Sequence, residues 1–247
     1  MTAPFSAIEI EINHACNRRC SYCPNSVSKR KSTGVIDPAL FSKILLELKV
    51  LSFSGRVSYD FYNEPLLHPD FEGVVAKTRA DLPKAAIVVY TNGTLLTRER
   101  LENLLSLGVT EFIVTRHEMD EGYEFDGVFE SLSSSARERV QYRGFRELKL
   151  TNRGGQLKHL GAEGLVLAPC HIPSMVVTVT VAGRVLPCFE DYDENLVMGN
   201  LHEESLLDIW NSGKFTRFRK DLRLGQRHAY VPCSGCNRVE SLQTARA

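Results

Sequence analysis

Apolar and polar residues alternate in segment 7–12 (Ala-Ile-Glu-Ile-Glu-Ile), which predicts a first β-strand. Short runs rich in β-branched and aromatic residues predict further strands at 57–62, 86–90, 112–115 and 148–150. Between these runs the apolar residues recur at helical spacing, which predicts helices over 38–48, 69–80 and 98–107. Strands that alternate with helices over the first 150 residues indicate a parallel sheet of the α/β class.

The ends of two predicted helices are marked in the sequence. Asp37 stands directly before Pro38, and Thr97 precedes the helix that Gly108 stops. Asp and Thr side chains cap exposed backbone N–H groups, and glycine adopts the left-handed conformation common after a helix.

Polar side chains follow the predicted strands. Tyr62-Asn63-Glu64 follows the second strand, Tyr90-Thr91-Asn92 the third, Arg116-His117 the fourth and Asn152-Arg153 the fifth. In a parallel α/β barrel the chemistry lies at the carboxyl ends of the strands. We therefore expect these side chains around one site.

The pattern changes at about Pro169. Segments 175–181 and 185–186 flank Ala182-Gly183-Arg184, which predicts a β-hairpin. Helical spacing follows over 206–210 and 215–222. We therefore expect two parts, residues 1–160 and 161–247.

Composition excludes several classes of protein. Thirty Lys and Arg residues balance thirty Asp and Glu residues, so no global charge attracts the chain to nucleic acid or to an anionic membrane. Residues 1–12 lack the pattern of a secretory signal, and no apolar stretch is long enough to span a bilayer. We expect a cytoplasmic protein, in which seven cysteines do not form a disulfide framework.

The first cysteine motif is Cys16-x3-Cys20-x2-Cys23, directly after the first strand. Three thiolates on one loop can hold three corners of a cubane cluster and leave the fourth iron open. An open position is the mark of a metal site that binds a substrate. The alternative is a zinc site completed by His14 or another side chain.

Four further cysteines lie in the second part. Cys233 and Cys236 form a C-x2-C pair, whereas Cys170 and Cys188 bracket the predicted hairpin. Four thiolates can close a second iron–sulfur cluster completely, and they can equally hold a structural zinc. The spacing alone does not distinguish an iron–sulfur cluster from a structural zinc.

The C-x3-C-x2-C motif, with Tyr22 just before its third cysteine, resembles the radical S-adenosylmethionine (SAM) superfamily. The resemblance implies a partial (β/α)6 barrel of TIM type and a 4Fe-4S cluster whose open iron binds SAM. It implies that Tyr22 lies against the adenine and that Glu64 binds the methionine amino group. Where the family usually has Gly-Gly-Glu, this chain has Tyr62-Asn63-Glu64, and Asn63 tolerates a left-handed backbone. We also expect SAM contacts from Asn92, Arg116 and His117.

The second part resembles the SPASM extension of that superfamily in its shortened twitch form. The resemblance lies in Gly183-Arg184-Val185-Leu186-Pro187-Cys188, Met198-Gly199-Asn200 and Asp208-Ile209-Trp210-Asn211. It implies a second, auxiliary 4Fe-4S cluster held by Cys170, Cys188, Cys233 and Cys236.

Four segments resemble a branch of the superfamily that oxidises an aminocyclitol alcohol to a ketone in aminoglycoside antibiotic biosynthesis. These segments are 22–31, 90–93, 152–155 and 186–191. The resemblance implies that Arg153 stabilises the developing oxyanion and that Glu190, Tyr62 and Tyr90 line the substrate pocket. It also implies an aminocyclitol or amino-sugar substrate.

The number of cysteines favours a dehydrogenase. Three cysteine ligands for one cluster and four for the other use all seven thiols of the chain. A radical epimerase must return a hydrogen atom to its product, usually from a free cysteine, and none would remain here. An oxidation needs a proton acceptor and an electron sink instead, and the second cluster can be that sink. A radical epimerase, another radical modification of a carbohydrate or peptide, and a non-catalytic zinc scaffold remain alternatives. Lys29-Arg30-Lys31 predicts either a solvated loop or a docking site for a flavodoxin or ferredoxin electron donor.

Overall fold

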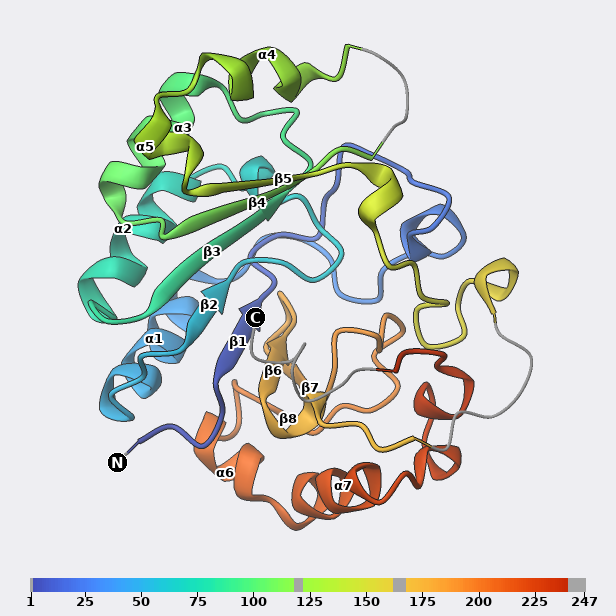
Figure 1. Cartoon of the computed structure of the whole chain (residues 1–247). Helices are drawn as coiled ribbons and strands as arrows, with labels where there is room; N and C mark the ends of the chain where they lie inside the picture. The colour runs from blue at the N-terminus through green and yellow to red at the C-terminus, as the bar shows by residue number, and fades with distance from the viewer. Residues whose placement is uncertain (1, 118–121, 162–167, 240–247) are drawn as a thin grey trace.

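The computed structural model describes residues 2–117, 122–161 and 168–239 (Figure 1). Its strands form one eight-stranded sheet in the order β5-β4-β3-β2-β1-β6-β7-β8. The order shows that the chain builds outward from β1 in one direction and then returns to the other side of β1.

The first five strands are parallel, as the sequence predicts. They are β1 (Ala7–Ile10), β2 (Arg56–Ser58), β3 (Ala86–Thr91), β4 (Glu111–Thr115) and β5 (Val140–Arg143). The strand predicted at 148–150 is wrong: β5 lies earlier, and 148–150 has no regular structure. The wrong segment was chosen because Val140–Arg143 carries Gln, Tyr and Arg, and its pairing with β4 depends on backbone hydrogen bonds that composition does not show.

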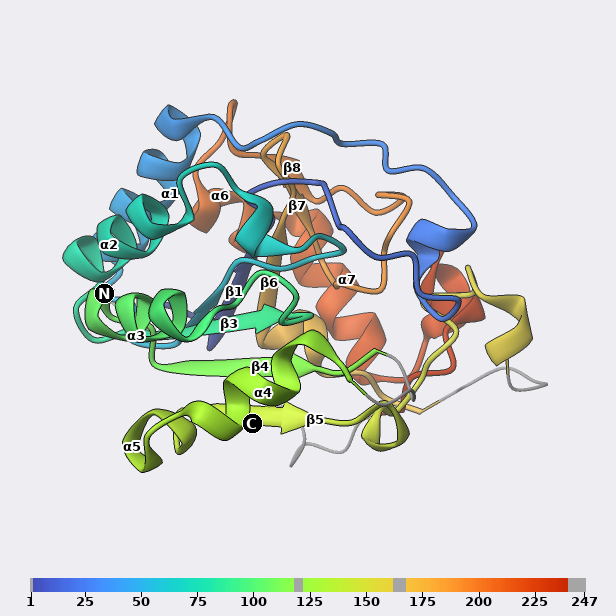
Figure 2. The ribbon, with the colours of Figure 1, turned by 90° about the horizontal axis from the view of Figure 1, so that it is seen from above.

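Helices connect these strands and cover one face of the sheet (Figures 1 and 2). They are α1 (Pro38–Val50), α2 (Phe71–Asp81), α3 (Arg98–Leu107), α4 (Glu124–Ser131) and α5 (Ser134–Arg137). The predicted caps are confirmed. Asp37 accepts a hydrogen bond from the Ala39 N–H, Thr97 accepts one from the Arg100 N–H, and Gly108 has a left-handed backbone.

The sixth parallel strand comes from the C-terminal part. β6 (Val176–Val179) pairs parallel with β1, and β7 (Arg184–Leu186) and β8 (Gly199–Asn200) follow antiparallel. The predicted hairpin is therefore present, and its first strand also extends the main sheet. Helices α6 (Leu206–Asn211) and α7 (Gly213–Arg223) complete this part, at the positions predicted.

The two faces of the sheet differ in polarity. Ile8 and Ile10 of β1 point into the hydrophobic core beneath the helices. Glu9 lies in register with Ser58 of β2 and Thr178 of β6, and all three are buried on the opposite face. Successive side chains of a strand point to opposite faces, so this face is a polar interior. It lies toward the cysteine loops.

The described loops contain seven short 3₁₀ helices. They are Pro24–Ser26, Pro65–Leu67, Phe145–Glu147, Lys158–Leu160, Ile172–Ser174, Arg227–Ala229 and Cys233–Gly235. Within the described ranges, no helix combines the length and the apolar character that crossing a membrane requires.

Candidate functional site

The first cysteine motif occupies the loop between β1 and α1. Cys16, Cys20 and Cys23 are all partly exposed, and none forms a disulfide. The Cys23 N–H donates to the Cys20 carbonyl at 2.9 Å, which turns the loop, and an isolated bridge between Asn13 and Val35 closes its base. The loop therefore presents three thiols at the carboxyl end of the central strand.

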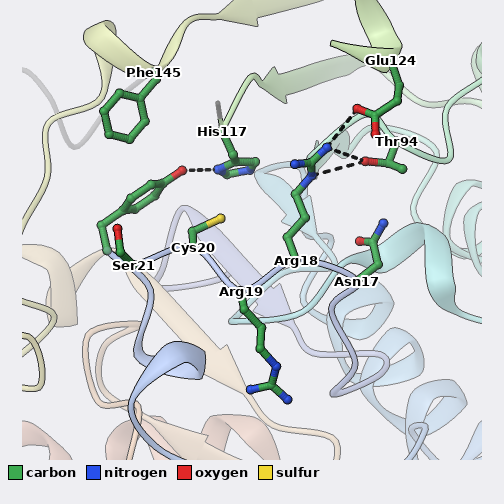
Figure 3. Close-up of a pocket in the computed structure, with 10 residues that line it drawn as sticks. Asn17, Arg18, Arg19, Cys20, Ser21, Thr94, His117, Glu124 and Phe145 are labelled. Atoms are coloured by element: carbon green, nitrogen blue, oxygen red, sulfur yellow. Dashed lines mark hydrogen bonds and ion pairs between the residues drawn. The ribbon is translucent and has the colours of Figure 1, made fainter. Parts of the chain in front are cut away.

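An open cavity of about 750 Å³ lies beside this loop (Figure 3). Arg18 donates to the Thr94 hydroxyl at 3.2 Å and to Glu124 at 2.9 Å, whereas the Arg19 side chain points away from them. The lining residues are Asn17, Arg18, Arg19, Cys20, Ser21, Tyr22, Thr94, His117, Glu124 and Phe145.

Aromatic rings form one wall of this cavity. The Tyr22 and His117 rings stack with their centroids 5.9 Å apart, and Phe145 lies 5.3 Å from Tyr22. The Tyr22 hydroxyl hydrogen-bonds to His117 Nδ1. Burial lowers the pKa of His117 to about 4, so the ring is neutral near pH 7. Flat, neutral rings beside Cys20 suit a planar heterocycle such as adenine.

Glu64 is held rigidly at the ends of β2 and β3. It is 2% exposed. One carboxylate oxygen accepts from the Thr91 hydroxyl at 2.7 Å and from the Leu66 N–H at 3.1 Å, and the other accepts from the Asn92 N–H at 2.8 Å. Burial raises the pKa of Glu64, and the Asn92 N–H opposes that shift. The carboxylate is fixed at the mouth of the sheet.

Asn63, next to Glu64, does not adopt the left-handed backbone that an asparagine tolerates. Instead the Asn63 side chain accepts from the Phe61 N–H and donates to Asn13 and to the Tyr59 carbonyl, so it braces the turn through side-chain hydrogen bonds.

Asn92 and Arg116 lie in different surroundings. The Asn92 side chain donates to Asn17, a cavity residue, at 2.7 Å. Arg116 instead forms an ion pair with Asp126 of α4 at 3.1 Å. Asn92 thus contacts a residue of the cavity wall, and a SAM contact stays a prediction at both Asn92 and Arg116.

The four C-terminal cysteines line one enclosed, mostly apolar cavity. Cys188 is the most deeply placed, and burial raises its pKa well above 9. Burial also raises the pKa of Cys233 to about 12, and neighbouring Cys236 and Cys170 add to the shift. The other lining residues are Ile172, Pro173, Pro187, Glu190, Asp191, Leu196, Leu222, Arg227, Pro232 and Arg238.

The donor sets fit iron–sulfur clusters better than zinc. Across the described ranges, no three Cys, His, Asp or Glu side chains converge on a point that could hold a single metal ion. A cubane cluster spreads its cysteines over separate iron atoms, so its ligands stand further apart than those of one zinc. His14 Nδ1 lies 2.8 Å from the Gly34 nitrogen and 3.1 Å from its carbonyl oxygen, and within the described ranges His14 belongs to no group of three possible metal ligands. The raised thiol pKa values mean that iron binding displaces protons.

Arg153 and Glu190 meet between the two cysteine groups. Arg153 has a left-handed backbone (φ 51°), and its Nη1 lies 3.7 Å from Glu190. The Arg153 guanidinium lies 5.9 Å from the Tyr62 ring centroid. Tyr62 is buried, and its hydroxyl has no hydrogen-bond partner. Burial is the main reason that the pKa of Tyr62 is raised. The negative charge of Glu190 raises it further, and so do Cys23 and Cys188. The pKa of Tyr62 therefore depends on the charge at both cysteine groups.

Tyr90 takes a different position from the one expected. Its hydroxyl accepts from Arg56 at 3.2 Å, and Arg56 pairs with Glu9 at 3.3 Å, in the polar interior. Burial raises the pKa of Tyr90 to about 12. Within the described ranges Tyr90 contacts Arg56 and makes no hydrogen bond, ion pair or ring contact with Arg153 or Glu190, so its role at the substrate stays a prediction.

Sequence reasoning missed three contributors to this region. Arg238 donates to Glu190 at 2.7 Å and lies 4.8 Å from the Phe189 ring centroid, and the Thr151 hydroxyl donates to Glu190 at 3.2 Å. One signal was available: Arg238 follows Cys236 by two residues, as Glu190 follows Cys188. The third contributor is Arg30, which the sequence placed in a solvated or docking loop. Its side chain is only 5% exposed.

Comparison with known proteins identifies the family. The Radical SAM superfamily model matches residues 10–126, and the SPASM iron–sulfur cluster-binding domain model matches residues 170–237. The S-adenosyl-L-methionine-dependent 2-deoxy-scyllo-inosamine dehydrogenase of Niallia circulans is 46% identical over 97% of this chain and 95% of its own length. The chain belongs to the radical SAM superfamily.

Solved structures agree with this assignment. The crystal structure of BtrN in complex with AdoMet and 2-DOIA superimposes with a TM-score of 0.91 at 46% identity, covering 97% of this chain and 95% of that one. An open conformation of BtrN, with the same coverage, gives 0.77 at 39% identity. The predicted fold class, family and radical SAM oxidoreductase activity are confirmed, together with iron–sulfur and SAM chemistry.

Proposed function

We propose that this radical SAM dehydrogenase oxidises a secondary alcohol of an aminocyclitol of the 2-deoxy-scyllo-inosamine type to a ketone, in aminoglycoside antibiotic biosynthesis. The observation that carries the proposal is the Arg153–Glu190–Tyr62 cluster between an open and an enclosed cysteine group. The Niallia circulans dehydrogenase and the BtrN complex support the same substrate class.

The chain would hold two 4Fe-4S clusters. Cys16, Cys20 and Cys23 would hold the first and leave one iron open to SAM. Cys170, Cys188, Cys233 and Cys236 would close the second completely. When bound, the first cluster and SAM supply a 5′-deoxyadenosyl radical that removes the carbinol hydrogen atom.

The SAM site is proposed at the cavity of Figure 3 and at the neighbouring strand ends. The Tyr22 and His117 rings would receive the adenine, and Glu64 would accept from the methionine ammonium. Asn63 and Asn92 would brace this end of the site, and Arg116 is retained as a proposed contact.

Arg153 and Glu190 would divide the work at the substrate. Arg153 stays protonated, so it would bind the hydroxyl oxygen and stabilise negative charge as the hydroxyl proton leaves. Glu190 would bind the substrate ammonium or accept the proton. Tyr62 and Tyr90 would shape the pocket. The balance of the oxidation is one hydrogen atom, one proton and one electron, and the second cluster would take the electron.

A labelled substrate tests the activity. Anaerobic, reconstituted protein is incubated with SAM, dithionite and 2-deoxy-scyllo-inosamine that carries deuterium on the oxidised carbon. We expect one deuterium in 5′-deoxyadenosine for each ketone formed, both measured by mass spectrometry. An Arg153→Lys variant keeps the charge but loses the planar fork, and should form ketone about 10–100-fold more slowly. Deoxyadenosine without ketone from any aminocyclitol would contradict the proposal.

The same experiment tests a second candidate function, that of a radical epimerase. An epimerase would give an epimer of the substrate in place of the ketone. The seven cysteines argue against it, because the two proposed clusters would use every thiol of the chain. We also propose a flavodoxin or ferredoxin as electron donor and a domain boundary near residues 160/161, which falls between the two family-model matches.

A further inference from the structure

A buried ion network joins the first cysteine loop to the segment that follows Cys188. Arg30 Nη2 donates to both carboxylate oxygens of Glu11, at 2.9 and 3.0 Å, and lies 3.6 Å from Glu194. Its Nη1 donates to the Tyr192 carbonyl at 2.7 Å. Arg30 is 5% exposed, and both carboxylate side chains are fully buried. Water therefore cannot replace these contacts.

Aromatic contacts complete the junction. The Arg30 guanidinium lies 4.4 Å from the Phe61 ring centroid and 5.1 Å from that of Tyr192. The Tyr192 hydroxyl donates to the Ser28 carbonyl at 2.8 Å and lies 3.1 Å from the Asn25 side-chain oxygen. Arg30 thus connects three parts of the molecule: β1, the loop after β2, and the C-terminal segment 188–194.

The junction is tied closely to both cysteine groups. Asn25 follows Cys23 by two residues, and its side-chain nitrogen donates to the Tyr62 carbonyl at 2.7 Å. Tyr192 follows Cys188 by four residues, and its ring packs edge-on against the Tyr62 ring at 4.9 Å. A change in the Arg30 contacts would therefore alter the position of Tyr62, which lies between the two cysteine groups.

We propose that Arg30 is a positioning residue that fixes the separation of the two clusters across the substrate, and so couples hydrogen-atom removal to the second electron transfer. The proposal rests on the proposed function. The rate of electron transfer falls steeply with distance, whereas hydrogen-atom removal depends on contact with SAM. A loosened junction would therefore let SAM cleavage continue while ketone formation fails.

The planar fork of arginine makes this role specific. Nη2 contacts both carboxylate oxygens of Glu11 and lies near Glu194, Nη1 donates to the Tyr192 carbonyl, and the flat guanidinium lies against two rings. A lysine ammonium supplies the charge without the fork or the flat face. Arg30→Lys should therefore restore only part of the function that Arg30→Gln loses.

The first test compares Arg30→Gln and Arg30→Lys with Lys29→Gln, a matched change at the exposed neighbour in the same loop. Anaerobic holoenzymes turn over an aminocyclitol with dithionite as reductant, and the ratio of deoxyadenosine to ketone is measured. Wild type and Lys29→Gln should give equal amounts. Arg30→Gln should raise the ratio at least about fivefold, with Arg30→Lys intermediate. An unchanged ratio in Arg30→Gln, or an equal loss of both products, overturns the proposal.

A second readout does not depend on ketone formation. Amide hydrogen exchange of the same holoenzymes should quicken over 24–32 and 190–196 in Arg30→Gln, while α3 keeps the wild-type rate. If wild type makes no ketone from any aminocyclitol, the proposed function fails, and this measurement still examines the junction. Unchanged exchange in both segments, or faster exchange throughout the chain, would overturn the role of Arg30.

Discussion

The two cysteine groups have opposite surroundings. Cys20 lies on an open cavity of about 750 Å³ with charged and aromatic walls, whereas Cys188 lies in an enclosed cavity with Ile172, Leu196 and Leu222. Polar groups and open space suit a metal that must bind and release a ligand. An apolar enclosure suits a metal centre that exchanges only electrons, since solvent exposure and hydrogen bonds to sulfur set the potential of a cluster.

Backbone contacts sharpen this difference. In the second group the Glu190 N–H donates to Cys188 Sγ and the Arg238 N–H donates to Cys236 Sγ, both at 3.4 Å. Each of these two residues also contributes a side chain to the cluster around Arg153. The second metal centre and the proposed substrate pocket are therefore built from the same two turns. Substrate oxidation and electron removal can occur at neighbouring positions.

The largest effect is expected from Cys20→Ala. Removing one of only three thiols at an open cluster should abolish SAM cleavage, by at least about 100-fold, because no other protein ligand can replace it. Iron should fall to about half of the wild-type content, since the second group is separate. Iron and sulfide analysis and a deoxyadenosine assay measure both quantities. Complete loss of iron would show that the two groups are not independent.

Cys188→Ala should separate the two activities. SAM cleavage should remain measurable, whereas ketone formation should fall by about 100-fold because the electron acceptor is lost. Deoxyadenosine and ketone are measured in one anaerobic reaction, with Cys20→Ala beside it as the variant that loses both. An equal loss of the two products would make the second centre structural.

A smaller effect is expected from Glu64→Gln, which acts on the first region alone. The amide would replace one carboxylate oxygen by an N–H₂ group, which would then face either the Asn92 N–H or the Leu66 N–H and Thr91 hydroxyl. The KM for SAM should rise about 10–100-fold, the equivalent of about 1.5–3 kcal/mol. Glu102→Gln on exposed α3 serves as the control. An unchanged KM would remove Glu64 from the SAM site.

The last prediction concerns stability and not activity, through the charge of Glu11 beneath the first loop. Burial raises the pKa of Glu11 from 4.5 to about 7, although Arg30 opposes the shift. Folded Glu11 therefore binds its proton more tightly than unfolded Glu11 does. This difference stabilises the folded protein fully below pH 4.5, and the stabilisation is lost as the pH rises to about 7. It amounts to at most roughly 3 kcal/mol. Glu11→Gln should lack this pH dependence.

Anaerobic denaturation between pH 4.5 and 8 measures the stability of both proteins. Glu138→Gln, at an exposed position, is the matched control. We expect the stability of the wild type to fall relative to that of Glu11→Gln as the pH rises over this range. If it does not fall, Glu11 is ionised throughout and the prediction is wrong.

Local patterns were enough to predict much of the molecule. The alternation in 7–12, the caps at Asp37 and Thr97, and the stop at Gly108 each depend on neighbours within a few residues. The cysteine motif is also local, since one loop carries all three thiols. These features could be read from the sequence because a short segment contains both partners of each interaction.

Other features required partners far apart in the chain. β5 was misplaced because its pairing with β4 is the only thing that makes Val140–Arg143 a strand. The geometry at Asn63 could not be read from the sequence, because a side chain 50 residues away, Asn13, holds its turn. Arg30 was assigned to a solvated or docking loop and Arg238 was not singled out, since their carboxylate partners lie 19 and 48 residues away.

The sequence by itself determined the chemistry of this protein: which residues can bind iron, in what number, and at which strand end. Only the tertiary structure decided where that chemistry is open or enclosed, and which charges lie between the two cysteine groups. The physical reason is that ligand type is a property of single residues. Burial, electrostatic surroundings and the distance between two centres arise only when distant segments pack together.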